Sequence, residues 1–235
     1  MSKFYKIILF LILVLLLELI FIGNRPNIKK KSGLYEVSNY SSKKSILILI
    51  DLTVSRMEVF QDGNVIKVYP ISGGRESSPS PIGTFYITSK DTWGEGFGGK
   101  WMGLSVPWGK YGIHGTMYPS LIGSNCSKGC IRMKSSDAAQ LYKMVSYGTK
   151  VIIYGGPYGN FGEYLRTIKP GFRGSDVYEV QRLLKEKGYL KGYVDGIYGE
   201  SMKYSIHKFQ KDNKLPISDN ISYAFYKKLG VELID

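Results

Sequence analysis

Cysteine and histidine are the scarcest chemically reactive residues in this sequence. Its 235 residues include two cysteines, Cys126 and Cys130, and two histidines, His114 and His207. So few cysteines exclude the dense disulfide framework that stabilises many small secreted domains. Any chemistry that needs a thiol or an imidazole must therefore use these four residues.

Acidic residues are few relative to basic ones. The chain has 32 Lys and Arg against 19 Asp and Glu, which gives a formal net charge of +13. Such a field attracts polyanions, whether nucleic acid, acidic lipid or the anionic polymers of a cell wall, and charge alone does not choose among them. A hydrophobic fraction of 43% excludes a disordered or collagen-like chain. The length predicts one enzyme-sized domain and a smaller one.

The one long apolar run lies near the N-terminus. Residues 7–22 read IILFLILVLLLELIFI, and only Glu18 interrupts the run. A membrane-spanning helix needs about 20 residues, whereas the apolar part of a signal peptide is usually about 7 to 15 long. We expect residues 1–23 to form a single transmembrane anchor, and the rest of the chain to lie outside the cell membrane. The basic residues that follow the run count against this orientation, but long domains cross largely regardless of such charges.

Different periodicities divide the remaining chain. Short runs rich in apolar and β-branched residues predict strands over residues 46–50, 65–69, 84–88 and 151–154. Helical spacing predicts helices over residues 137–147, from Val177 to Leu184, from Glu200 onward, and through Tyr223, Tyr226 and Leu229. Asp176 and Glu179 have the spacing of a helix capping box. The predicted domains are a basic linker at 24–44, a mainly β domain with a short helix at 45–155, a linker at 156–169, and a three-helix domain at 170–235.

A histidine motif and a cysteine motif stand close together. Ile113-His114-Gly115-Thr116 precedes Cys130 by sixteen residues, counted from the histidine. A cysteine thiolate is a strong nucleophile, and an imidazole can carry its proton. Gly129 allows a tight turn before Cys130, so backbone amides there could face a developing oxyanion. Arg132 could bind a substrate carboxylate or hold the loop. These residues predict acyl transfer with Cys130 as nucleophile and His114 as base.

The segments IHGT and SKGCIRM resemble the active-site signature of the L,D-transpeptidase catalytic domain family. Residues 80–85, Ser-Pro-Ile-Gly-Thr-Phe, are similar to the Thr-Pro-x-Gly-x-Phe of that family. The resemblance covers roughly residues 45–155, and Lys128 stands where the family often has histidine. It implies a β-sandwich with a short helix that works without a metal or cofactor.

By this resemblance, Cys130 attacks the carbonyl of the third residue of a peptidoglycan stem peptide and D-Ala leaves. An amine of a neighbouring stem then resolves the thioester to a 3→3 cross-link. The backbone carbonyl of Gly115 would orient His114, and the backbone of Gly129 would donate to the oxyanion. The remaining expected substrate contacts are Arg132, Ser127 and Tyr111.

The C-terminal region resembles a three-helix peptidoglycan-binding domain. The matching segments are Gly174-Ser175-Asp176-Val177, Val180-Gln181-x-Leu183, Gly188-Tyr189, residues 194–199 and Phe209-Gln210. The implied partner is peptidoglycan, both stem peptide and glycan. Three tyrosines could stack on sugar rings or simply pack within the domain: Tyr189, Tyr193 and Tyr198.

Other functions remain possible for the same residues. An L,D-carboxypeptidase would use water in place of the amine, a sortase-like transpeptidase also combines an anchor with His, Cys and Arg, and a non-catalytic wall-binding protein would use both domains for adhesion. An exported chain rarely meets nucleic acid, so we assign the positive charge to anionic wall polymers or acidic lipid, with no nucleic-acid partner.

Three further signals carry less weight. Residues 94–99 satisfy GxGxxG, but no helix pattern follows, so we expect a loop near the active site rather than a nucleotide site. Cys126 is expected to be a bystander thiol, with an inactivating disulfide to Cys130 as the alternative. His207 is expected on a helix surface.

Overall fold

The computed structural model describes residues 45–94 and 98–233. The predicted membrane anchor at 1–23 and the basic linker at 24–44 lie outside the described residues. Within the described ranges, no helix combines the length and apolar character needed to cross a membrane.

Eight strands form one continuous sheet in the order β3-β2-β1-β8-β4-β5-β6-β7. The strands are β1 (Ile46–Asp51), β2 (Arg56–Gln61), β3 (Asn64–Pro70), β4 (Gly83–Asp91), β5 (Trp101–Leu104), β6 (Gly112–Thr116), β7 (Ile131–Lys134) and β8 (Lys150–Tyr154). Most neighbours are antiparallel, but β1 pairs with β8 and β6 with β7 in parallel. The mainly β prediction for this domain is confirmed.

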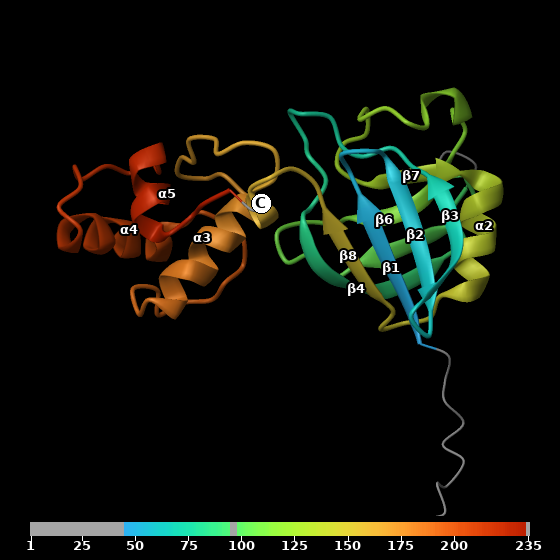
Figure 1. Ribbon diagram of the computed structural model, residues 1–235, viewed down its shortest axis with the longest axis horizontal. Coiled ribbons are helices and arrows are strands. Elements are labelled where there is room, and N and C mark those ends of the chain that lie inside the picture. The colour runs from blue at the N-terminus through green and yellow to red at the C-terminus, as the bar shows by residue number, and fades with distance from the viewer. Residues whose placement is uncertain (1–44, 95–97, 234–235) are drawn as a thin grey trace, which may run out of the picture. The chain divides into compact units, whose positions relative to one another are not determined.

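The sheet curls until its two ends approach each other (Figure 1). Ser72, just after β3, exchanges two backbone hydrogen bonds with Arg132 on β7, at 2.8 and 2.9 Å. This bridge joins the first and last strands of the sheet order. The expected sandwich is therefore built from one curled sheet rather than from two separate sheets.

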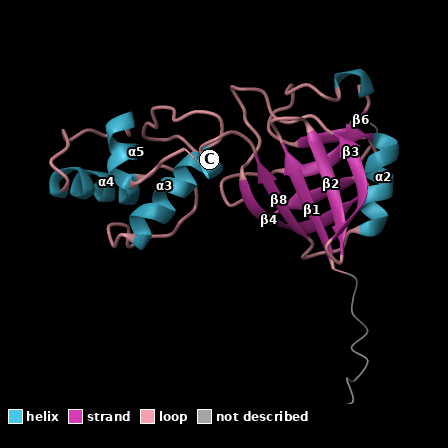
Figure 2. Cartoon of the chain, viewed as in Figure 1, coloured by secondary structure: helices cyan, strands magenta, loops and turns pink. Residues whose placement is uncertain are grey.

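Alternate residues of the strands supply an apolar core. Ile48 and Ile50 of β1 are fully buried, as are Met57 and Val59 of β2, in the two-residue period of a strand with one face inward. Burial of each such side chain contributes roughly 1.5–3 kcal/mol. Helix α2 (Ser135–Met144) packs on β5, β6 and β7 and buries Ala138 and Leu141 (Figure 2).

Four strands were not predicted from the sequence: β2, β5, β6 and β7. The sequence of β6 is Gly-Ile-His-Gly-Thr, which has little strand propensity and no alternation, yet all five residues are buried. Its partners β5 and β7 hydrogen-bond it from both sides. Pairing with these neighbours, rather than local preference, makes this segment a strand.

The C-terminal part is helical, as predicted. It contains α3 (Ser175–Glu186), α4 (Glu200–Asp212) and α5 (Tyr223–Leu229), and short 3₁₀ turns occur elsewhere at Pro119–Leu121 and Gly159–Phe161. The helices share a core that includes Val177, Val180, Leu184, Met202, Ile206, Phe209, Phe225, Tyr226 and Leu229. Tyr223 does not join it: its side chain is 67% exposed.

The predicted capping box at the start of α3 is wrong. Gly174 occupies the cap position, and no side chain caps the helix. The Asp176 carboxylate instead accepts from Arg166 at 2.5 and 3.1 Å, and Glu179 pairs with Arg182. Both acidic side chains therefore form ion pairs, and the Asp176 carboxylate also accepts from the backbone N–H of Val177 at 2.9 Å.

Candidate active site

The sheet brings the predicted histidine and cysteine onto one face. In the register of the sheet, His114 on β6 lies opposite Trp101 of β5 and Arg132 of β7. Paired residues on adjacent strands point to the same side of a sheet. Cys130 directly precedes β7, and its thiol is hydrogen-bonded by the backbone of Gly112, two residues before His114. Strand pairing thus places thiol, imidazole and guanidinium together.

The imidazole of His114 is buried and held by the next residue. Its side chain is 4% exposed, and Nδ1 lies 2.6 Å from the carbonyl oxygen of Gly115. This is the contact expected from the sequence. Because a carbonyl oxygen can only accept, Nδ1 carries the proton, which leaves the Nε2 lone pair to act as a base.

The surroundings of His114 favour its neutral form. Burial lowers the pKa of the imidazole, the hydrogen bond with Gly115 opposes this shift, and the positive charge of Arg132 lowers the pKa further. The net pKa lies below the ordinary value of about 6.5. His114 is therefore unprotonated at neutral pH, as a general base must be.

Burial has the opposite effect on the pKa of Cys130. It raises the pKa of the thiol, while the Gly112 backbone and the Arg132 charge partly offset that rise. The net pKa lies above that of a free cysteine, so the resting thiol keeps its proton. Attack by this sulfur requires a base, because little thiolate is present beforehand.

Ser127 holds the loop in front of Cys130. Its side chain is fully buried, its Oγ donates to the carbonyl oxygen of Cys130 at 2.6 Å, and it accepts from the backbone N–H of Gly129 at 2.9 Å. The expectation that Ser127 contacts substrate does not fit this burial. The expectation of an oxyanion donor at Gly129 does not fit either, because that N–H already has an acceptor.

Gly129 and Tyr111 pack closely at the mouth of the site. Gly129 has φ of +109°, and a Cβ there would lie 2.7 Å from the Tyr111 ring. The combination of positive φ and close ring contact explains why glycine precedes the cysteine. Tyr111 and Lys128 also line a cavity of about 640 Å³, which leaves room for a substrate beside the loop. Burial raises the pKa of Tyr111, so its phenol stays neutral.

The remaining candidates lie as follows. Cys126 and Cys130 are both free thiols, with no disulfide between them. His207 is only partly exposed, and its Nε2 lies 2.8 Å from a carboxylate oxygen of Asp219.

Gly98, near the end of the glycine-rich loop, packs against Gly115. A Cβ on Gly98 would lie 2.4 Å from the backbone carbonyl carbon of Gly115. Gly98 therefore borders the site, and residues 95–97 of the predicted loop lie outside the described residues. Across the described residues, no cluster of His, Cys, Asp or Glu could hold a metal ion.

The three tyrosines proposed to stack on sugars differ in exposure. Tyr198 is buried and donates its hydroxyl to the backbone oxygen of Asp219, while Tyr189 packs edge-on against Phe209. Tyr193 is 89% exposed. Only Tyr193 of the three presents an open ring.

Sequence reasoning missed two residues beside His114. Trp101 stacks against the imidazole, and Gly112 provides the space for the Trp101 ring, which a Cβ on Gly112 would approach to 2.6 Å. Neither belongs to the two motifs. Only the pairing of β5 with β6 shows the connection, so no sequence signal would have revealed it.

Fold and site together define a class of protein with a thiol and an imidazole on the face of a curled β sheet, followed by a small helical domain. Residues 45–153 match the model of the L,D-transpeptidase catalytic domain, and residues 173–228 match that of the "Putative peptidoglycan binding domain". The chain thus contains one segment that matches the L,D-transpeptidase catalytic domain and a second that matches a peptidoglycan-binding domain.

Several known proteins are similar to parts of the chain. "Putative L,D-transpeptidase YkuD" of Bacillus subtilis is 38% identical over 107 residues, which are 45% of this chain and 64% of that protein. "Spore cortex-lytic enzyme" of Bacillus cereus is 34% identical over 67 residues, 28% of this chain and 26% of that protein. The chain spans less than two thirds of the length of these relatives.

Solved structures are similar over about half of the chain. An L,D-transpeptidase from Mycobacterium smegmatis is 26% identical, with 48% of this chain and 59% of that chain covered and a TM-score of 0.42. The catalytic domain of the E. faecium L,D-transpeptidase is also 26% identical, with 48% of this chain and 99% of that chain covered and a TM-score of 0.42.

Proposed function

We propose that this protein is a peptidoglycan L,D-transpeptidase that forms 3→3 cross-links through a thioester on Cys130. The observation that carries the proposal is the fixed imidazole: His114 Nδ1 is held at 2.6 Å by Gly115, and the thiol of Cys130 is hydrogen-bonded by the backbone of Gly112, two residues away on the same strand. A protonated thiol next to a neutral, oriented imidazole is the resting state that general-base catalysis needs. The match of residues 45–153 to the L,D-transpeptidase catalytic domain supports the same chemistry.

In the first half-reaction, Nε2 of His114 takes the proton of Cys130 as sulfur attacks the carbonyl of the third stem residue. The tetrahedral oxyanion needs an N–H donor, and the Cys130 amide is the candidate because the Gly129 amide bonds Ser127. Collapse breaks the peptide bond. His114 returns its proton to the departing D-Ala amine, and the thioester remains on Cys130.

The second half-reaction reverses these roles. An amine of a neighbouring stem gives up a proton to His114 as it attacks the thioester, and the thiol of Cys130 is regenerated with that proton. The charge of Arg132, which acts on both Cys130 and His114, also suits the carboxylate of a stem peptide. With water as the acceptor, the same site would act as a carboxypeptidase.

We further propose that the helical domain holds the enzyme on peptidoglycan, and that residues 1–23 anchor it in the cell membrane with both domains outside. The family of residues 173–228 supports the first point, and the apolar run supports the second. The net charge of +13 suits contact with anionic wall polymers or acidic lipid. Protease treatment of intact cells should degrade residues 45–235, and protection of this region would overturn the orientation.

Mass spectrometry tests the reaction. Full-length protein is incubated with a carbapenem and, separately, with a disaccharide-tetrapeptide, alongside Cys130→Ala and the matched variant Cys126→Ala. We expect an adduct and a cross-linked dimer lacking one D-Ala from the wild type and Cys126→Ala, and neither from Cys130→Ala. Release of D-Ala without a dimer would indicate a carboxypeptidase, and the absence of both adduct and release would leave a wall-binding protein.

A further inference from the structure

A stack of aromatic rings extends outward from His114. Trp101 on β5 faces the imidazole with ring centroids 5.8 Å apart and an angle of 29° between the planes. Trp93 in turn stacks on Trp101, nearly parallel at 3° and with centroids 4.6 Å apart. The ammonium of Lys110 lies 4.6 Å from the Trp93 ring centre. The same ammonium lies 5.9 Å from the Trp101 ring centre, so imidazole and two indoles form the stack and the ammonium lies beside both indoles.

Neighbouring residues fix the position of the Trp101 indole. Its Nε1–H donates to Ser89 Oγ at 3.2 Å, and it lies over Gly103 and Gly112, which face each other across β5 and β6. A Cβ on Gly112 would come within 2.6 Å of the ring, and one on Gly103 within 3.1 Å of Nε1. Only 3% of Trp101 is exposed. Two facing glycines and one hydroxyl thus fix the ring beside His114.

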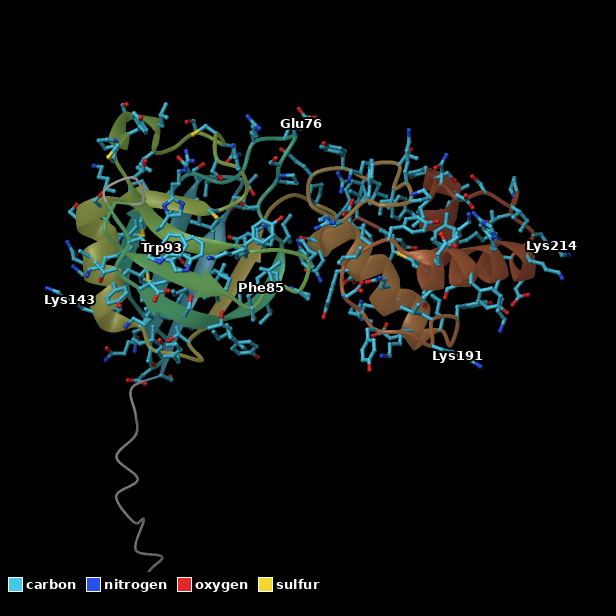
Figure 3. The ribbon with its side chains drawn as sticks, turned by 180° about the vertical axis from the view of Figure 1, so that it is seen from behind. Glu76, Phe85, Trp93, Lys143, Lys191 and Lys214 are labelled. Carbon is cyan, nitrogen blue, oxygen red and sulfur yellow. The ribbon has the colours of Figure 1, made fainter. Side chains whose placement is uncertain are left out.

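Trp93 closes the stack from outside the sheet. It follows β4 and is partly exposed, and Figure 3 shows it lying against the strands of the sheet. Its contact with Trp101 is face to face, and Lys110 lies close enough for a cation–π interaction. The aromatic wall on one side of His114 therefore includes a residue that lies in the loop after β4.

We propose that Trp101 and Trp93 are positioning residues, which hold the His114 ring in the orientation needed for proton exchange with Cys130 and keep water from one of its faces. The hydrogen bond to Gly115 O fixes one edge of the imidazole but still permits rotation about that bond. A flat partner against the ring face removes this freedom, because stacked aromatic rings prefer defined geometries. This role rests on the proposed function of His114 as the base.

The pKa of His114 reports on the stack, and it also depends on the charged and titratable groups around the imidazole. Cys130 and Arg132 flank it from the β7 side, Asp91 lies opposite Trp101 on β4, and Lys110 lies beside both indoles. Burial is the main reason that the pKa of His114 is low. Removal of Trp93 admits water toward the imidazole, so the pKa of His114 should rise toward its ordinary value.

NMR titration of His114 in the full-length protein provides the test, because the chain has just two histidines and His207→Asn identifies the other signal. Trp93→Ala should raise the pKa of His114, move the acid limb of kcat/KM upward by the same amount, and lower kcat roughly 2- to 10-fold. Trp93→Phe should restore much of each quantity. Tyr147→Ala, at an exposed tyrosine outside the site, is the control and should change none of them.

Trp101→Phe is a second variant, but it changes a buried residue and its protein could fail to fold. The Trp93 variants should fold in either case, because Trp93 is partly exposed. An unchanged His114 pKa together with an unchanged pH profile in Trp93→Ala would overturn the proposal. The titration needs no substrate. If His114 responds to Trp93→Ala but the wild type releases no D-Ala, the positioning role stands and the transpeptidase proposal fails.

Discussion

The hydroxyl of Ser127 donates to the carbonyl oxygen of Cys130 at 2.6 Å and accepts the N–H of Gly129, so one buried side chain fixes the backbone on both sides of the thiol. The carbonyl and the amide would otherwise lack partners in a buried loop. A buried polar group without its partner costs about 1–3 kcal/mol. The loop geometry around Cys130 therefore depends on Ser127.

Ser127→Ala should lower the free energy of unfolding by about 1–3 kcal/mol and slow carbapenem acylation of Cys130. Ser124→Ala is the matched control, because Ser124 also donates to a backbone carbonyl but lies on the surface. Chemical denaturation and adduct mass spectrometry measure the two effects. Equal stability and equal acylation rates in both variants would show that Ser127 does not hold the loop.

Gly112→Ala should destabilise the catalytic domain by about 1–3 kcal/mol, as overpacking in a core typically does. The added methyl would lie 2.6 Å from the Trp101 ring and 2.8 Å from the carbonyl oxygen of Met102. Gly199→Ala is the control, because no atom lies within 4 Å of its added Cβ. Thermal melts compare the two, and a Gly112→Ala protein as stable as the control would contradict the packing.

The pH dependence follows from the lowered pKa of His114. The base acts only when neutral, so activity is lost as pH falls through this pKa, and the acid limb of kcat/KM should lie below about pH 6.5. Arg132→Gln removes a positive charge that disfavours the imidazolium, so the acid limb should move to higher pH. Lys150→Gln, at an exposed lysine on β8, should leave it in place. An acid limb that stays fixed in Arg132→Gln would exclude this electrostatic coupling.

In the helical domain, Gln181 makes four hydrogen bonds around one turn. Its amide donates to Asp195 Oδ1 and Ile197 O, and its oxygen accepts from the N–H groups of Asp195 and Gly196, all within 3.0 Å. Gln210 makes two such bonds, both with Ser218, and is buried to the same extent.

Gln181→Ala should therefore cost about 2–4 kcal/mol of stability, and Gln210→Ala about 1–2 kcal/mol. Sedimentation with purified wall at a temperature where Gln181→Ala begins to unfold should show a matching loss of binding. Equal stability losses in the two variants would mean that the extra bonds of Gln181 contribute little.

Among the described residues, local pattern was enough to predict half of the strands and the helices α2, α3, α4 and α5. β1 and α4 show this, since Ile48 and Ile50 alternate inward, while Met202, Ile206 and Phe209 recur at helical spacing and are buried. These signals are local because each residue's burial follows from its place in the repeat. The capping box of α3 failed because the helix begins at Ser175 with Gly174 as its cap, and the Asp176 carboxylate pairs with Arg166.

The sequence by itself determined the order and type of the reactive groups, with His114 and Cys130 in two short motifs and Gly115 next to the imidazole. Tertiary structure alone decided that Ser127 is buried beneath the loop, that the Gly129 N–H is already bonded, and that Trp101 lies against His114. The reason is strand register. Hydrogen bonds between β5, β6 and β7 align residues that are distant along the chain, and no local pattern encodes which residues they align.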